Sequence, residues 1–226
     1  MSYTWLLFDA DETLFDFSLA AANALEWTLR QAGLPWEPGY TPLYKQANDQ
    51  VWQEFERGEL TQKELRTKRF VLFLEAAGLQ ADPLAVSPLY IKNLALGTHL
   101  IDGAHEVIHQ LKTRHRLALV TNGLAEVQRP RLEHSSLWDC FEHIFISEEM
   151  GVAKPSAAYF EAVFARIEEP PREQVLIIGD SLSSDMRGGL DFGIATCWFN
   201  PLGKTTDLAV TYQIARLEEL YALLGS

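Results

Sequence analysis

The sequence predicts an α/β protein built on a doubly wound parallel sheet, with an all-helical segment inserted near its N-terminus. Short apolar runs each end in polar residues or glycine, and helical patterns fill most stretches between them. Apolar runs of this length are typical of strands buried on both faces, as parallel strands are. The expected strands are residues 5–8, 117–120, 175–178 and 195–199, with a shorter run at 144–146.

The helices expected between these strands each have one apolar face. One covers residues 103–112 and another covers 156–167, where apolar residues recur at helical spacing behind Ser156, a candidate N-cap. Strands that alternate with helices in this way predict crossover connections, and therefore a parallel sheet covered on both faces.

The stretch from residue 17 to residue 96 breaks this alternation, because it carries helix signals in succession and no strand pattern. We therefore expect an α/β core formed by residues 1–16 and 97–226, and a helical insert formed by residues 17–96. The insert's signals are a start at Thr41-Pro42, a stop at Gly58, a capping box from Thr61 to Glu64, a stop at Gly78 and a start at Asp82-Pro83.

The charge of the chain argues against a nucleic-acid polymer as its partner. The 226 residues carry a formal net charge of -12, and no basic patch stands out that would neutralise a phosphate backbone. A small phosphate compound is not excluded, because it needs only a local cradle of backbone N–H groups, a lysine and a metal ion.

The N-terminal run and the cysteines give no sign of export. The first apolar run has no basic segment before it and is far too short for a signal peptide or a membrane span. Cys140 and Cys197 lack the spacing of a disulfide framework or a zinc site, and we expect both to be buried apolar residues. The histidines show no metal-like spacing. We expect a cytoplasmic protein without membrane association, and the sequence leaves its oligomeric state open.

Two aspartates directly follow the first predicted strand, where open α/β sheets place their ligand sites. Asp9 and Asp11 are two residues apart, so in an extended chain both side chains point into the same crevice. Close carboxylates repel each other unless a cation or a shared proton compensates. A single aspartate after a strand is commonly a loop cap, so the case for a site depends on further acidic residues.

A second acidic pair, Asp180 and Asp185, follows the predicted strand at residues 175–178. Carboxylate oxygens that converge from separate strands suit Mg²⁺, which prefers octahedral oxygen coordination completed by water and substrate phosphate. The sequence therefore predicts a magnesium site at the carboxyl ends of these strands.

Two further segments supply groups that bind phosphate. Thr121-Asn122-Gly123 follows the second predicted strand and offers a hydroxyl, an amide and a flexible glycine turn to a phosphoryl oxygen. Lys154 places a cation beside Pro155, which restricts the backbone before the next helix. Each segment alone is weak evidence, because such residues are common in loops and on surfaces.

In their order along the chain, these segments resemble the four motifs of the haloacid dehalogenase superfamily of phosphatases. The resemblance spans nearly the whole chain and implies a Rossmann-like core with the helical insert as a cap domain. Around Asp9 and over residues 146–155 the sequence is also similar to bacterial pyrimidine 5′-nucleotidases of this superfamily. The segments are Asp9-Ala10-Asp11-Glu12-Thr13-Leu14, Thr121-Asn122-Gly123, Lys154-Pro155, and Gly179-Asp180 with Asp185.

The resemblance implies a covalent mechanism for phosphate ester hydrolysis. Asp9 would attack phosphorus to form a phosphoaspartate, and its carboxylate would also bind Mg²⁺. Asp11 would protonate the leaving alcohol and then deprotonate the attacking water, while its backbone carbonyl binds the metal. The superfamily's dehalogenases lack this second aspartate and need no magnesium, so Asp11 indicates phosphoryl transfer.

The remaining site residues that the resemblance implies fall into two sets. The phosphoryl group, whose equatorial oxygens carry the charge, would be held by Thr121, Asn122, Gly123 and Lys154. The metal would be bound directly by Asp180, and Asp185 would be either a further ligand or a partner of one.

Three functions are consistent with these features. The leading hypothesis is a Mg²⁺-dependent phosphomonoester hydrolase acting on nucleoside 5′-monophosphates, a 5′-nucleotidase that favours pyrimidines. A phosphatase or phosphomutase of sugar phosphates or phosphoglycolate shares every motif and differs only in its cap. A catalytically idle binding module is the third, and the acidic cluster argues against it. Most aromatic residues of the insert are expected in its core, with Trp52 and Tyr44 the first candidates for stacking on a base.

Overall fold

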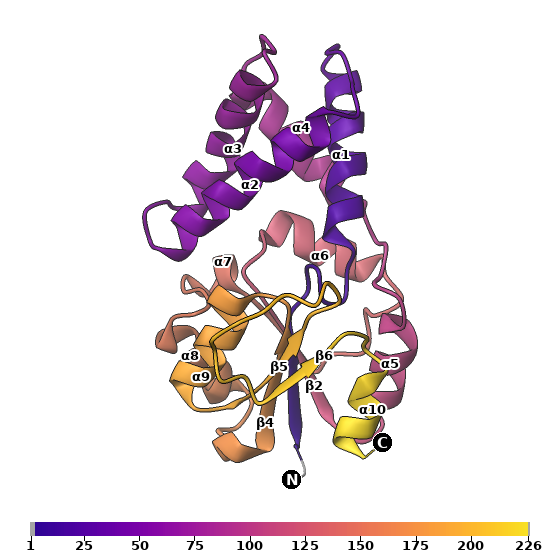
Figure 1. Cartoon of the computed structure of the whole chain (residues 1–226), viewed down its shortest axis with the longest axis vertical. Helices are drawn as coiled ribbons and strands as arrows, with labels where there is room; N and C mark the ends of the chain where they lie inside the picture. Colours follow the sequence, from indigo (N-terminus) through magenta and orange to yellow (C-terminus); the bar gives the residue numbers. More distant parts are fainter. Residues whose placement is uncertain (1–2, 226) are drawn as a thin grey trace.

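The computed structural model describes residues 3–225 and shows a parallel sheet flanked by helices, with a further group of helices beyond one end of the sheet (Figure 1). This confirms the doubly wound α/β fold. The strand order is β3-β2-β1-β4-β5-β6, and every neighbouring pair is parallel. The strands are β1 (Trp5–Phe8), β2 (Arg116–Thr121), β3 (His143–Ile146), β4 (Val175–Gly179), β5 (Ala195–Phe199) and β6 (Tyr212–Ile214).

Both faces of the central strands are apolar, because alternate side chains of a strand pack into two apolar clusters on opposite sides of the sheet. In β1, Leu6 and Phe8 belong to one cluster, whereas Trp5 and Leu7 belong to the other. The first face is covered by α5 (Ala104–Leu111) and α10 (Glu219–Leu224), and the second by α8 (Ala157–Arg166) and α9 (Arg187–Phe192). The other short elements are α6 (Ala125–Glu133), α7 (Ser147–Met150), a 3₁₀ turn (Arg172–Gln174) and a π-helical turn (Leu182–Met186).

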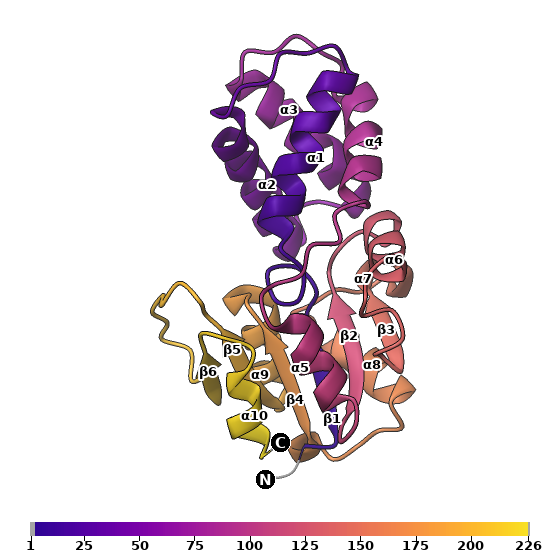
Figure 2. The same cartoon turned by 90° about the vertical axis from the view of Figure 1, so that its right-hand side faces the viewer.

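Four helices between β1 and α5 form what we call the α1–α4 unit. They have an apolar cluster of their own, to which Leu124 and Val127 from the start of α6 also contribute. Figure 2 shows this unit beyond the carboxyl ends of the strands, where loops from the sheet face it. That it acts as a separate cap domain stays a prediction. The helices are α1 (Phe17–Gln31), α2 (Tyr40–Glu56), α3 (Gln62–Ala76) and α4 (Pro83–Leu94).

The chain passes between the sheet and the α1–α4 unit twice, and the two connecting segments are joined by backbone hydrogen bonds. The Asp16 amide donates to the His99 carbonyl over 3.0 Å, and the Ile101 amide donates to the Leu14 carbonyl over 2.9 Å. These bonds fix the segment that follows Asp9 against the segment that returns from α4. Among residues 3–225, no helix combines the length and apolar character needed to cross a lipid bilayer.

Most of the expected helix ends are confirmed. Thr61 and Glu64 form a reciprocal capping box at the start of α3, and the Asp82 side chain caps α4, whose first residue is proline. Gly58 and Gly78 each follow the C-cap residue of α2 and α3, and their positive φ angles of 74° and 64° are adopted by glycine without strain. Cys140 and Cys197 are both buried, as expected.

Two expectations about the start of α2 were wrong. Thr41 is not an N-cap, because α2 already begins at Tyr40 and its N-cap is Gly39. Pro42 is then the third helical residue, where the missing N–H is tolerated because first-turn amides have no partner within the helix. Ser156 is the N-cap residue of α8, as expected, although its side chain makes no capping hydrogen bond. The short edge strand β6 was not expected at all.

Gly189 provides a test of how α9 packs on the sheet. A β-carbon at this position would lie 2.7 Å from Thr196 Cγ2 and 2.8 Å from Ile177 Cγ2. Gly189→Ala is therefore expected to lower the free energy of unfolding by about 1–3 kcal/mol, as overpacked cores do. Urea unfolding measures the change.

The matched control is Gly39→Ala. A β-carbon there meets nothing within 4 Å, and the φ of Gly39 is -64°, which alanine adopts readily. Its stability should stay within a few tenths of a kcal/mol of the wild type or rise slightly. Equal stability of the two variants would contradict the close packing of α9.

Candidate active site

The predicted site residues come together at the carboxyl ends of the central strands. From β1 the chain proceeds outward through β2 and β3, and from β4 it proceeds in the opposite direction through β5 and β6. The order reverses between β1 and β4, and open α/β sheets bind ligands in the crevice at such a point. Asp9 follows β1 there, and Asp180 follows β4.

A buried ammonium group joins two of the predicted carboxylates. Lys154 Nζ donates to Asp9 Oδ1 and Asp185 Oδ1, each over 2.6 Å, and to the Val120 carbonyl over 2.8 Å. Lys154 and Asp185 are 2% and 0% exposed, so their charges have little water around them. Charges buried to this degree are stable only when paired and hydrogen-bonded.

The pKa values of these groups reflect the same burial. Loss of water raises the pKa of the Asp9 carboxyl to about 7, with a further upward contribution from Asp185 and an opposing one from Lys154. Burial acts in the opposite direction on Lys154, but attraction to Asp185 and Asp9 outweighs it and raises the Lys154 pKa above its ordinary value. The lysine is therefore held in its charged form.

Asp185 fits beside the sheet only because residue 179 is glycine. A β-carbon on Gly179 would lie 2.2 Å from Asp185 Oδ2. The same oxygen accepts a hydrogen bond from the Ser181 amide over 3.2 Å. The glycine before Asp180 thus provides space for the carboxylate that pairs with Lys154.

The acidic groups suit a hard cation. One carboxylate oxygen from each of Asp9, Asp180 and Asp185 lies within 4.8 Å of the others. Burial, reinforced by Asp9 and Asp185, raises the pKa of Asp180 well above its ordinary value. Carboxylates crowded in this way need positive charge beyond the single lysine, and oxygen donors of this kind are those that Mg²⁺ prefers.

A second group that contains possible metal ligands lies outside this site. One ligand atom from each of His109, Asp139 and Cys140 lies within 4.8 Å of the others, although the spacing of the histidines gave no such signal. The Lys112 ammonium is 3.4 Å from Cys140 Sγ and 3.6 Å from Asp139 Oδ1. Because the lysine already supplies the positive charge there, we assign no metal to this group.

The Thr121–Gly123 loop is fastened to the Lys154 segment. Asn122 Nδ2 donates to the Lys154 carbonyl over 2.8 Å, and Asn122 Oδ1 accepts from the Lys154 amide over 2.9 Å. The Thr121 hydroxyl accepts from the Gly123 amide over 3.0 Å. Both ends of the Asn122 side chain thereby hold the Lys154 segment in place.

Asp11 points towards α6, and two of its partners were missed by the sequence reasoning. Gln128 Nε2 donates to Asp11 Oδ2 over 2.7 Å, and the Arg131 guanidinium pairs with Asp11 Oδ1. The available signal was a glutamine and an arginine on the same stripe of a helix as Leu124 and Val127, at positions i, i+3, i+4 and i+7.

A cavity of about 270 Å³ opens over Asp9 between the core and α2. Trp52 lines it, whereas Tyr44 does not and instead packs against Phe70, Phe73 and Tyr90 within the α1–α4 unit. Of the two aromatic candidates for base stacking, only Trp52 therefore faces Asp9. The lining residues are Asp9, Asp11, Glu12, Phe17, Asn48, Asp49, Trp52, Glu56, Thr121, Asn122, Gly123, Lys154, Asp180, Ser181 and Ser184.

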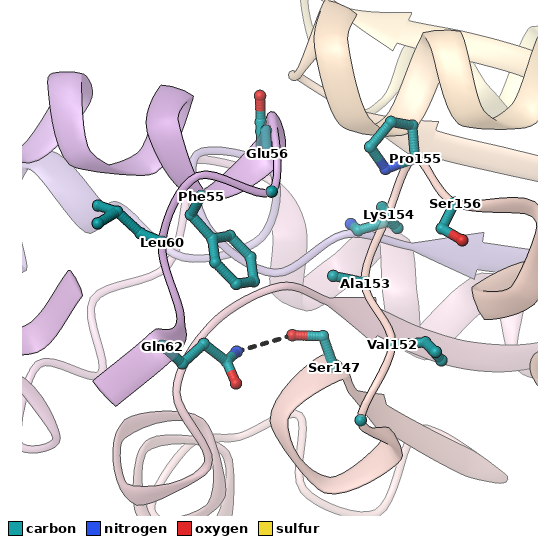
Figure 3. Close-up of a pocket in the computed structure, with 12 residues that line it drawn as sticks. Phe55, Glu56, Leu60, Gln62, Ser147, Val152, Ala153, Lys154, Pro155 and Ser156 are labelled. Atoms are coloured by element: carbon teal, nitrogen blue, oxygen red, sulfur yellow. Dashed lines mark hydrogen bonds between the residues drawn. The ribbon is translucent and has the colours of Figure 1, made fainter. Parts of the chain in front are cut away.

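A larger pocket of about 530 Å³ adjoins this cavity and shares Glu56 and Lys154 with it. Figure 3 shows Phe55, from the last turn of α2, opposite the segment that carries Lys154. On this side Gln62 Nε2 donates to Ser147 Oγ over 3.0 Å (Figure 3). That bond fastens the start of α3 to the core beside the site.

Comparisons with known proteins agree with this geometry. Residues 3–193 match the protein family described as haloacid dehalogenase-like hydrolase. The HAD-hydrolase YfnB of Bacillus subtilis is 40% identical over 99% of this chain and 96% of its own. Its magnesium-bound crystal structure has a TM-score of 0.95 and covers 100% of both chains.

Two further relatives are named pyrimidine 5′-nucleotidases. PynA of Streptococcus pneumoniae is 34% identical over 97% of this chain and 94% of its own. YjjG of Escherichia coli is 31% identical over 99% of each chain. The family match and these near full-length similarities lead to one conclusion: the chain belongs to the haloacid dehalogenase-like hydrolase family.

Proposed function

We propose that this protein is a Mg²⁺-dependent phosphatase that hydrolyses phosphate monoesters through a phosphoaspartate on Asp9. The observation that carries the proposal is the buried contact between Asp9 and Lys154, in a cavity that also contains Thr121 and Asp180. A carboxylate, a cation and a hydroxyl around one space suit a nucleophile and the binding of a phosphoryl group. The two relatives named as nucleotidases support the same chemistry.

Asp9 serves as the nucleophile in this proposal. Lys154 binds its Oδ1, which leaves Oδ2 to attack phosphorus. The bond from Oδ2 to phosphorus forms as the bond from phosphorus to the leaving alkoxide breaks, and Asp11 gives the alkoxide its proton. Water then attacks the phosphoaspartate, Asp11 takes a proton from that water, and inorganic phosphate leaves with Asp9 restored.

Asp9 and Asp180 are the residues that would hold Mg²⁺, together with the backbone carbonyl of Asp11. When bound, the ion supplies positive charge that offsets the repulsion between these carboxylates and a phosphate dianion. Asp185 already binds Lys154 and the Ser181 amide, so its main role in this proposal is to fix the lysine. Lys154, Thr121 and backbone amides near Gly123 would bind the phosphoryl oxygens.

Nucleoside 5′-monophosphates are the proposed substrates. Trp52 offers a ring on which a base can stack, at the wall of the cavity over Asp9. Arg69 Nη1 donates to Asn48 Oδ1 over 3.3 Å, and because arginine only donates hydrogen bonds, the Asn48 oxygen must face it. The Asn48 amide group is then left to donate to a ligand, and the carbonyl oxygens of a pyrimidine are suitable acceptors.

The direct test is hydrolysis of a panel of phosphate esters by the purified protein. We expect phosphate release from 5′-monophosphates such as UMP, dUMP and dTMP with Mg²⁺, its loss in EDTA and its return when Mg²⁺ is added in excess. Full activity in chelator would refute the metal assignment. Preference for sugar phosphates or phosphoglycolate would support the alternative substrate class, and inactivity towards every ester would support a binding module.

Asp9→Asn is expected to abolish turnover, because an amide neither attacks phosphorus nor brings a negative charge to the metal. The rate with 4-nitrophenyl phosphate should fall by several orders of magnitude, while circular dichroism and thermal unfolding still report a folded protein. Asp191→Asn makes the same charge change at an exposed residue of α9 and should keep wild-type activity. Substantial turnover by Asp9→Asn would place the nucleophile elsewhere.

Trp52→Ala tests whether α2 selects the leaving group. Loss of a stacked ring should lower kcat/KM for the preferred nucleotide by about tenfold, since stacking is worth about 1–3 kcal/mol per base. Acetyl phosphate, which has no base, should be affected much less. Trp27→Ala removes an exposed tryptophan from α1 and should change neither value. Equal losses on both substrates after Trp52→Ala would contradict a stacking role.

A further inference from the structure

Asp11 is bound on both of its oxygens by residues of α6. Gln128 Nε2 donates to Oδ2 over 2.7 Å, and Arg131 Nη2 donates to Oδ1. Arg131 Nη2 also donates to Gln128 Oε1 over 2.9 Å, so the three side chains form a closed network. The two partners fix the rotation of the carboxylate, and each of its oxygens keeps a second lone pair for another contact.

The network is buried on the α6 side. Gln128 is 2% exposed and Arg131 is 0% exposed. Among residues 3–225, Asp11 is the one carboxylate within 4.0 Å of the Arg131 nitrogens, and the Phe15 ring lies 4.8 Å from its guanidinium carbon. Burying an arginine costs free energy that only a paired anion offsets. The contact between Arg131 and Asp11 is therefore a buried ion pair and not a surface one.

Gly123 makes room for this contact. A β-carbon at residue 123 would lie 2.1 Å from Gln128 Nε2 and 2.8 Å from Gln128 Cδ. Gly123 is not among the glycines with positive φ, so its backbone does not require glycine. The absence of a side chain lets Gln128 pass to Asp11, and this is a different role from the flexible turn that the sequence suggested.

α6 also has a rigid support. Leu124 and Val127 pack into the apolar cluster of the α1–α4 unit, one turn before Gln128 and Arg131 on the same stripe. Side chains presented by a packed helix are held more closely than those of a loop. Asp11 is thus positioned from an element that contacts both parts of the molecule.

We propose that Gln128 and Arg131 are positioning residues that hold the Asp11 carboxyl in place for proton transfer to the leaving group and from water. The proposal rests on the phosphatase function proposed above. Proton transfer needs its two heavy atoms within hydrogen-bond reach, and a displacement of about 1 Å costs as much as a hundredfold in rate. A carboxylate without these two donors would rotate and reach the productive orientation less often.

The test is Gln128→Met, which keeps the length of the side chain and removes the amide. For a nucleotide, whose alkoxide leaves poorly, kcat/KM should fall about tenfold to a hundredfold. For 4-nitrophenyl phosphate, whose phenolate needs little protonation, it should fall much less. Since kcat/KM reports the steps up to alcohol release, slow dephosphorylation does not obscure the comparison. An equal fall for both substrates would overturn the proposal.

A double-mutant cycle tests whether Gln128 acts on the rate through Asp11. In an Asp11→Asn background, Gln128→Met should cause no further loss, because the group that it positions is already gone. A full additional loss in that background would overturn the proposal. Arg131→Lys serves as a second variant, with the same leaving-group dependence expected, and thermal unfolding checks that each protein is folded.

Arg129→Met is the matched control, because it removes an arginine from the same helix. Arg129 pairs with Glu149 rather than with Asp11, so both substrates should be hydrolysed at wild-type rates. Ester hydrolysis by the wild-type protein distinguishes failure of the positioning role from failure of the phosphatase assignment. If it hydrolyses none of the esters, the phosphatase assignment itself fails; if it is active and Gln128→Met lowers neither rate, only the positioning role fails.

Discussion

The buried ammonium of Lys154 is the interaction on which the rest of the site depends. Asp9 follows β1 and Asp185 lies in the turn after β4, and the same ammonium group donates a hydrogen bond to each of their carboxylates. Removing one partner from such a buried pair usually costs about 3–5 kcal/mol, because the charge left behind has neither water nor a counter-ion. The lysine therefore holds the sheet's carboxyl ends together before any ligand is bound.

The sequence segments around this lysine support one another. Asn122 holds the Lys154 backbone from one side, and Gly179 leaves space for the carboxylate that pairs with the ammonium. Gly123 likewise leaves space for Gln128. Glycine and asparagine are common in loops, but here each is required by a contact of a neighbouring side chain or backbone segment. Preorganisation of this kind makes the contacts available to a transition state without rearrangement.

The fold could be predicted because its signals are local. Strands buried on both faces read as apolar runs, and caps such as Thr61 lie within a few residues of their partners. Asp9, Thr121 and Asp180 could be placed because each lies at or directly after the end of a strand. Gln128 and Arg131 could not, since a helical pattern shows which residues share a face but not what that face contacts. The contact between Asn122 and the Lys154 backbone was not foreseen for the same reason, because the two residues are 32 positions apart.

The pairing of β1 has a consequence for how the protein is made. β1 lies between β2 and β4, whose residues begin at 116 and 175, so its apolar side chains emerge long before either neighbour. At a synthesis rate of roughly 5–20 residues per second, about 10–30 s pass before β4 leaves the ribosome. The helices of residues 17–94 can meanwhile pack against one another, whereas Asp9 and Asp185 can meet only after β4 is made. During synthesis, β1 is thus the segment that chaperones have most reason to shield.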